Sequence, residues 1–212
     1  MDSEHLADAF AAARDGDGRA FAVLWRALQP GVLRYLRVVV GEAAQDVASE
    51  TWLQVARDIG GFRGDVAGFR VWLFRIARNR GLDELRRAGR RREDLRELTG
   101  EDGEPAPDAV VEAMDSLDTG WALEVIGTLP ADQAEAVMLR VVAGLDVAQT
   151  AAVLGKRSGA VRVAALRGLR RLARHPQVQA RWAERGRSGR PGAAEPEPAP
   201  EVLRSEPGDT GV

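Results

Sequence analysis

The sequence contains no cysteine, which excludes disulfides, thiolate metal sites, thiol nucleophiles and cysteine-based redox sensing. Aromatic residues are also scarce, at 5% of 212 residues with a single tyrosine. No apolar run approaches the roughly 20 residues that a membrane-spanning helix needs. The N-terminal residues are acidic and interrupted by glycine, unlike the basic and then apolar start of a signal peptide. These absences predict a cytoplasmic protein with no membrane partner.

The sequence has two histidines, His5 in the exposed start of the chain and His175 at the end of a predicted helix. Metal-ligand clusters and Ser-His-Asp triads therefore lack parts. The glycine clusters at 16–18 and 60–64 are not followed by the Lys-Ser/Thr pair of a phosphate-binding loop. We expect no metal, no cofactor and no catalytic residue. One enzymatic alternative stays open, a metal-dependent nuclease in which four carboxylates converge: Asp46, Glu50, Asp65 and Asp83.

Apolar residues recur at three- and four-residue steps through most of the chain, which is helical spacing, and few segments resemble strands. Pro30 either bends the first long helix or begins a second one. We predict an all-α protein with two small helical domains joined by a flexible acidic linker. The predicted order is an N-terminal segment (1–19), a helical domain (20–92), the linker (93–118), a second helical domain (119–175) and a disordered Pro/Gly/Glu-rich tail (176–212).

The second domain contains two short helical segments, 147–155 and 158–172, around a glycine-containing turn, which is typical of a helix-turn-helix. Ser158 either caps the second helix or meets a phosphate with its hydroxyl. Periodicity directs Val161, Leu169 and Leu172 inward. It directs arginines outward, where they suit the major groove of DNA, although a solvent-facing basic helix is the alternative.

The first domain ends in a basic segment, 69–92, that mixes many arginines with Phe69, Trp72, Phe74 and Asn79. Aromatic surfaces and cations together suit the unstacked bases of single-stranded DNA. Phe69 and Trp72 taken alone fit core packing better. The net charge of −2 does not contradict nucleic-acid binding, because the acidic residues concentrate in the linker.

Several short motifs occur together in the first domain: DVASETW (46–52), FRGD (62–65) and WLFRIARNR (72–80), followed by Asp83, Arg86 and Arg87. They resemble region 2 of extracytoplasmic-function (ECF) sigma factors. The second domain resembles region 4 of the same group through Leu129-Pro130, Leu139-Arg140, Gly144-Leu145, GAVRV (159–163) and RGLRRL (167–172). The resemblance covers about 20–175.

The resemblance implies a sigma factor that binds core RNA polymerase, reads the −35 and −10 promoter elements and helps melt the −10 region. Its implied partners are promoter DNA and the polymerase, through the clamp coiled coil of the largest subunit and the flap. An anti-sigma factor is a further candidate partner. Chemistry belongs to the polymerase, so the chain is not expected to be an enzyme. The alternative function is a stand-alone helix-turn-helix transcriptional regulator.

The resemblance also implies site residues. The polymerase-binding candidates are Asp46, Glu50 and Trp52. The −10 candidates are Phe62, Arg63, Gly64, Asp65, Trp72, Arg75, Arg78, Asn79, Arg86 and Arg87, with the loop 62–68 and Asn79 surrounding a flipped base. The −35 candidates are Ser158, Arg162, Val163, Leu166, Arg167, Arg170 and Arg171. The acidic linker is expected to thread the polymerase cleft.

Overall fold

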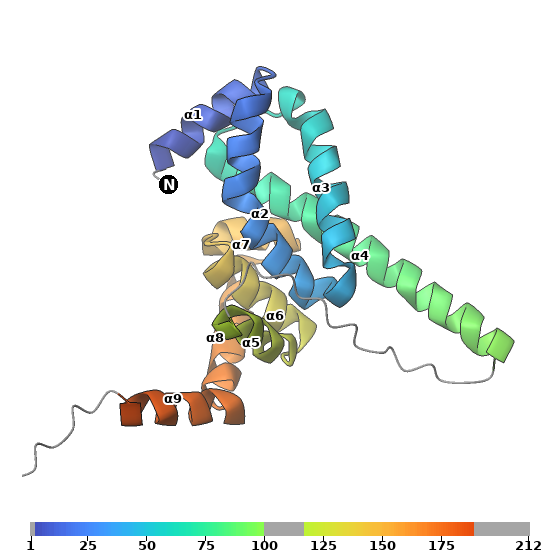
Figure 1. The fold of residues 1–212 in the computed structure, drawn as a ribbon, viewed down its shortest axis with the longest axis vertical. Helices are drawn as coiled ribbons and strands as arrows, with labels where there is room; N and C mark the ends of the chain where they lie inside the picture. The colour runs from blue at the N-terminus through green and yellow to red at the C-terminus, as the bar shows by residue number, and fades with distance from the viewer. Residues whose placement is uncertain (1–2, 100–116, 189–212) are drawn as a thin grey trace, which may run out of the picture. The chain divides into compact units, whose positions relative to one another are not determined.

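The computed structural model describes residues 3–99 and 117–188, and within these ranges it contains helices and no strand. This confirms the all-α prediction. Figure 1 shows the helices as α1 (Ser3–Arg14), α2 (Gly18–Val40), α3 (Ala44–Asp58), α4 (Val66–Thr99), α5 (Leu117–Gly127), α6 (Ala131–Val137), α7 (Val147–Leu154), α8 (Ser158–Ala173) and α9 (Pro176–Ser188). Short 3₁₀ turns, Gly41–Ala43 and Ile59–Gly61, flank α3, and a π-helical segment, Met138–Val142, follows α6.

The beginning of the chain forms α1, which the sequence analysis left outside the first helical domain. Phe10 of α1 is 4% exposed and its ring lies 5.0 Å from Phe69 and 5.8 Å from Phe62. Asp17 then caps α2, because its carboxylate accepts hydrogen bonds from the backbone N–H groups of Arg19 and Ala20. The helix continues past Pro30 to Val40, so Pro30 lies inside one helix and does not begin another.

Helices α2, α3 and α4 pack around a shared apolar core. Leu24, Val55, Phe69 and Leu73 have no exposed surface, which confirms the core interpretation of Phe69. The apolar stripe of each helix recurs at three- and four-residue steps, so burial of one face accounts for the association of the three helices. No described helix has the length and apolar character to cross a bilayer.

The helix-turn-helix is formed by α7, a turn at Gly155 and α8. Asp146 and Gln149 form a reciprocal capping box at the start of α7. Gly155 ends α7 with a φ of 63°, in the left-handed region that glycine tolerates. The inward prediction for Leu169 is wrong: this side chain is 46% exposed, because the buried face of α8 follows the spacing 161, 164 and 168.

One hydrophobic cluster contains side chains from both predicted helical domains, from Leu24 and Leu73 to Leu139 and Leu145. Helix α7 contacts α4, and α6 contacts α2, as Figure 1 also shows. The two halves of the chain therefore share a core in this arrangement.

Two predicted segments lie partly outside the described residues. Helix α4 extends to Thr99 and α5 begins at Leu117, so residues 100–116 of the predicted linker are not described. The first part of the predicted disordered tail, Pro176–Ser188, forms the helix α9. The rest of the tail, residues 189–212, lies outside the described part of the chain.

Candidate nucleic-acid interface

The face of α3 that carries Asp46 and Glu50 is exposed. Leu53 shares this face, three residues after Glu50, and is 68% exposed. Glu50 also lies 3.6 Å from the guanidinium of Arg80. Leu53 therefore adds one exposed apolar side chain to this charged face. The sequence analysis did not name Leu53, although its spacing of seven residues from Asp46 and three from Glu50 places it on the same helix face.

Trp52 lies on the opposite side of α3 and is only 6% exposed. Its indole N–H donates to the Gln29 side chain at 2.6 Å, and its ring meets Phe21 edge-on at 5.9 Å. Trp52 is thus held inside the fold, and its predicted contact with polymerase stays a prediction. It lies four residues after Ala48 and three before Val55, which are both buried, so it shares their inward face and anchors α3 against α2.

The loop between α3 and α4 is ordered by its own hydrogen bonds. The Asp65 carboxylate accepts from the backbone N–H of Gly68 at 2.8 Å, at the start of α4. Arg63 donates to the carbonyl oxygens of Gly60 and Phe62. Gly64 has a φ of 146°, a conformation that L side chains rarely adopt. The four predicted residues 62–65 thus shape the loop. The side chain of Arg63 is exposed.

A pocket of about 510 Å³ lies beside this loop. The rings of Phe62 and Trp72 form part of its wall, with centroids 5.2 Å apart. Arg57 and Asp58, which sequence reasoning missed, line it from the end of α3, together with Gly61. Both residues stand just before the Gly60-Gly61 pair, so the sequence could have placed them at the end of the helix, next to the loop. The pocket offers an aromatic surface with one cation and one carboxylate nearby.

Asn79 does not line this pocket. It lies seven residues after Trp72 on α4, which is two helical turns or about 10 Å along the helix axis. Arg75 and Asn79 are both exposed and share a face with Trp72 and Arg86, because the spacing is three, four and seven residues. This face therefore continues from the pocket along α4.

The other predicted arginines of α4 have carboxylate partners. Arg86 lies 2.8 Å from Asp83, and Arg87 lies 3.6 Å from Glu84. Arg78 lies on a different face, where its Nε is 2.8 Å from an oxygen of Glu135. One residue before Asn79, Arg78 is rotated by about 100° around the helix. Its predicted −10 contact stays a prediction.

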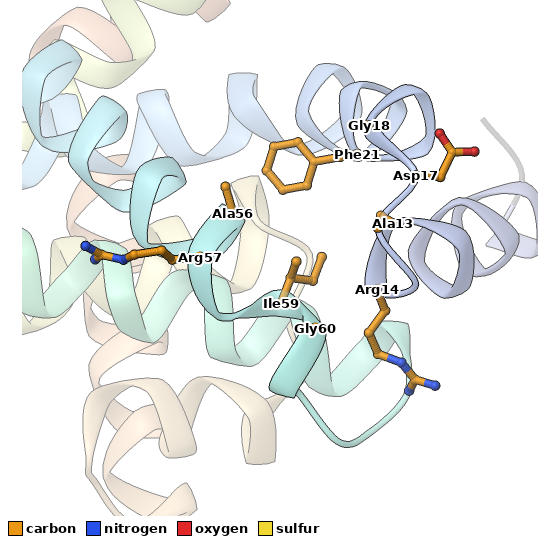
Figure 2. Close-up of a pocket in the computed structure, with 10 residues that line it drawn as sticks. Ala13, Arg14, Asp17, Gly18, Phe21, Ala56, Arg57, Ile59 and Gly60 are labelled. Carbon is orange, nitrogen blue, oxygen red and sulfur yellow. The ribbon is translucent and has the colours of Figure 1, made fainter.

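A second hollow, of about 330 Å³, lies between the α1–α2 turn and the end of α3. Phe21 and Ile59 contribute apolar surface to it, while Arg14, Asp17 and Arg57 point away from one another (Figure 2). Acid–base chemistry requires titratable groups that converge on one point. This arrangement does not bring them together.

The predicted outer face of α8 is exposed: Arg162, Val163, Leu166, Arg167, Arg170 and Arg171 all face solvent, and Val163 and Leu166 are 47% and 49% exposed. The residue at the N-cap is Arg157, with no side-chain cap. Ser158 is the first helical residue, so the capping interpretation of Ser158 is wrong. Its hydroxyl stays a predicted phosphate contact.

Toward the end of α8, a hollow of about 330 Å³ is lined by Gln133 and four arginines: Arg167, Arg170, Arg171 and Arg174. None of these arginines forms an ion pair with a carboxylate of the described residues. Sequence reasoning missed Arg174, although it continues the spacing of 167, 170 and 171. The hollow is an arrangement that suits an anion such as a phosphate.

The four carboxylates of the nuclease alternative do not form one cluster. Asp65 caps α4, Asp83 pairs with Arg86, and Glu50 lies near Arg80. Within residues 3–99 and 117–188, no three histidine, aspartate or glutamate side chains gather closely enough to hold a metal ion. The geometry gives this alternative no support.

Comparison with known proteins identifies the family. Residues 24–91 match Sigma-70 region 2, and residues 119–172 match Sigma-70 region 4. The chain is 37% identical over 182 residues to the ECF RNA polymerase sigma factor SigD of Mycobacterium tuberculosis, covering 81% of this chain and 84% of SigD. The chain belongs to the ECF sigma factor family. It is also 35% identical over 180 residues to BldN of Streptomyces coelicolor, covering 82% of this sigma factor and 66% of BldN.

Two solved structures share the fold of this sigma factor. CnrH, in complex with the cytosolic domain of CnrY, superposes with a TM-score of 0.55 at 23% identity, covering 80% of this chain and 95% of CnrH. RpoE of Bartonella quintana, in complex with the anti-sigma factor NepR, gives a TM-score of 0.58 at 22% identity, covering 73% and 94%. The similarity confirms the predicted fold class.

Family membership confirms the predicted function: the chain is a sigma factor that binds RNA polymerase and directs promoter-specific initiation. The stand-alone regulator is not favoured, because it explains only the helix-turn-helix and leaves the region 2 match in the first half without a role.

Proposed function

We propose that this sigma factor docks on the clamp coiled coil of the largest polymerase subunit through the α3 face of Asp46, Glu50 and Leu53. The observation that supports this site is the 68% exposure of Leu53 beside two exposed carboxylates. An apolar contact flanked by charges provides both affinity and partner choice. The polymerase flap is the second proposed contact, on the region 4 half.

The exposed face of α8 is the proposed reader of the −35 element. Arg162 and Arg167, both exposed, are the proposed partners of guanine O6 and N7 in the major groove. Val163 and Leu166 offer apolar contact to thymine methyl groups, while Arg170 and Arg171 hold phosphates. Arg174 and Gln133 extend this phosphate contact, since they line the same hollow as the later arginines.

The loop 62–68 and the exposed face of α4 are the proposed reader of the melted −10 element. Phe62 and Trp72 offer ring surfaces on which an unpaired base can stack. Arg75 supplies a cation along the strand, and Asn79 offers a donor and an acceptor to a base edge. Because Asn79 lies about two turns from the pocket, we assign it a neighbouring nucleotide in the same strand.

The remaining assignments follow from this function. We propose two working domains, 20–92 and 119–175, with the acidic segment 93–118 threading the basic polymerase cleft. The chain acts in the cytoplasm, where polymerase and promoter DNA are found, and the reaction belongs to the polymerase. An anti-sigma factor is a proposed partner, since two proteins of the same fold are described in complexes, one of them with the anti-sigma factor NepR.

The decisive experiment is reversal of the α3 charges, Asp46→Lys with Glu50→Lys, followed by a pull-down with core polymerase. We expect loss of core binding with unchanged helical content, because exposed charges contribute more to partner choice than to folding. The matched control is Asp15→Lys with Glu124→Lys, two exposed carboxylates outside this face with the same charge change. Core binding by the α3 variant equal to that of the control would exclude this face.

A further inference from the structure

Aromatic rings gather around the loop 62–68, although aromatic residues are scarce in this chain. They belong to Phe10 of α1, Phe62 of the loop, and Phe69 and Trp72 of α4, and neighbouring ring centroids lie 5.0–6.1 Å apart. The name aromatic cluster is used below for these four residues. Phe62 has each of the other three rings as a neighbour. The position of its ring is therefore set from two helices, α1 and α4.

Phe10 is the member of the cluster that α1 contributes. Its side chain is 4% exposed, and its ring lies 5.0 Å from that of the fully buried Phe69. It meets Phe62 nearly edge-on, at a centroid distance of 5.8 Å and an interplanar angle of 78°. Phe10 is not among the residues that line the pocket beside the loop. Any influence of Phe10 on a base in that pocket must therefore pass through a neighbouring ring.

The loop folds closely around the Phe62 ring. A Cβ atom built on Gly64 would lie 3.1 Å from Cε1 of Phe62, and one built on Gly68 would lie 3.7 Å from its Cζ. The same ring forms part of the pocket wall together with Trp72. Because packed side chains leave little free space, a displaced Phe62 ring moves the loop backbone as well as the pocket wall.

The end of α1 also packs against the turn that leads into the loop. Helix α1 contacts the turn Ile59–Gly61, and a Cβ atom built on Gly60 would lie 3.6 Å from the backbone oxygen of Arg14 (Figure 2). Phe62 follows this turn directly, and its backbone N–H donates to the carbonyl oxygen of Ile59 at 3.0 Å. Helix α1 therefore supports the loop at its entry and again at the Phe62 ring.

We propose that Phe10 is a positioning residue for −10 recognition. It holds the Phe62 ring, and with it the loop 62–68, in the orientation that accepts an unpaired base. The inference rests on the proposed reading of the melted −10 element by this loop. Phe10 lies before residues 24–91, which match Sigma-70 region 2. Helix α1 thus contributes to −10 recognition from outside the matched segment.

The ring of Phe10 contributes direction as well as bulk. Aromatic pairs prefer edge-on or offset arrangements, because the edge of a ring is positive and its face is negative. An aliphatic side chain of similar volume fills the space without this preference, so the neighbouring Phe62 ring gains freedom to tilt. Loss of one such pair corresponds to a factor of about two to ten in the population of the base-accepting orientation.

The test is transcription by the full chain with core polymerase from promoters with a randomised −10 element and a fixed −35 element. Discrimination is the ratio of product from the preferred −10 sequence to product from its single-base variants. We expect Phe10→Leu to lower discrimination by about two- to tenfold, with unchanged affinity for a −35 duplex. Phe10→Met also keeps apolar bulk without a ring and should behave alike. It replaces Phe10→Leu if circular dichroism shows that the leucine variant is unfolded.

The matched control is Phe74→Leu, the same substitution at a comparably buried position of α4. Phe74 is 2% exposed, and its described ring contact is with Tyr35 of α2, at 5.8 Å, and not with the aromatic cluster. This variant should lose thermal stability to a similar degree while its preferred −10 sequences stay those of the wild type. Wild-type preferences in Phe10→Leu, or an equal change in Phe74→Leu, would overturn the positioning role.

A double-variant cycle tests whether Phe10 acts through Phe62. Phe62→Leu should lower discrimination by itself, and adding Phe10→Leu should then change it little, because the ring that Phe10 orients is already absent. Effects that multiply independently would overturn the positioning role while the loop stays the −10 reader. Unchanged preferences in Phe62→Leu would instead exclude the loop as the reader, and the positioning role would fall together with the proposed function.

Discussion

Gly168 provides a quantitative test of the packing between α8 and α6. A Cβ atom at this position would lie 2.8 Å from Cγ2 of Val137, a distance that real Cβ atoms essentially never show. It would also lie 3.4 Å from the backbone oxygen of Gln133. Val137 is 2% exposed and β-branched, so its side chain has little rotamer freedom with which to move aside. The variant Gly168→Ala therefore forces α8 away from α6.

The expected cost combines two opposing effects. Overpacking of a buried contact costs about 1–3 kcal/mol. Alanine in a helix recovers up to about 1 kcal/mol relative to glycine. We therefore expect Gly168→Ala to lower the free energy of unfolding by up to about 2 kcal/mol. We also expect weaker binding to a −35 duplex, because α8 is displaced on its support.

Urea unfolding followed by circular dichroism measures this loss. The matched control is Gly159→Ala in the same helix, where no heavy atom lies within 4 Å of a built Cβ. This control should be neutral or stabilised by up to about 1 kcal/mol. If Gly168→Ala were as stable as Gly159→Ala, the close approach of α8 and α6 would be refuted.

Three further predictions concern DNA reading and pH. Arg167→Ala should weaken binding to a −35 duplex by about 1–3 kcal/mol; equal losses on specific and random duplexes, measured by fluorescence anisotropy, would reduce Arg167 to a phosphate contact. Asn79→Ala should change which sequences are transcribed from a randomised −10 library while −35 affinity stays constant, and unchanged preferences would leave Asn79 without a reading role. The single tyrosine allows direct titration of Tyr35 by tyrosinate absorbance. Because burial, and after it Glu135, raises the pKa of Tyr35 and Arg78 only partly opposes this, stability should be constant below the ordinary value of 10.0 and fall as pH rises from there through the raised pKa; Tyr35→Phe should lack this loss.

The sequence by itself determined the helical class and the position of most helices. Three- and four-residue spacing of apolar side chains is a local property, so it identified the segments that became α2, α3, α4 and α8. The turn at Gly155 and the end of α3 at Gly60-Gly61 were likewise readable, because glycine allows backbone conformations that other residues avoid. The family motifs added the function, since they combine residue types in a fixed order.

Only the tertiary structure decided which polar side chains face solvent. Trp52 and Arg78 belong to surface motifs by sequence, yet one is buried against α2 and the other pairs with α6. Leu169 is apolar but exposed, because Gly168, which has no side chain, is the residue of α8 that packs against α6. Glu135 gave no sequence signal as a buried residue, because its partners stand 57 and 100 residues away. Helical periodicity reports the neighbours of a residue within about two turns, whereas burial of a charge depends on distant groups that only the folded chain brings together.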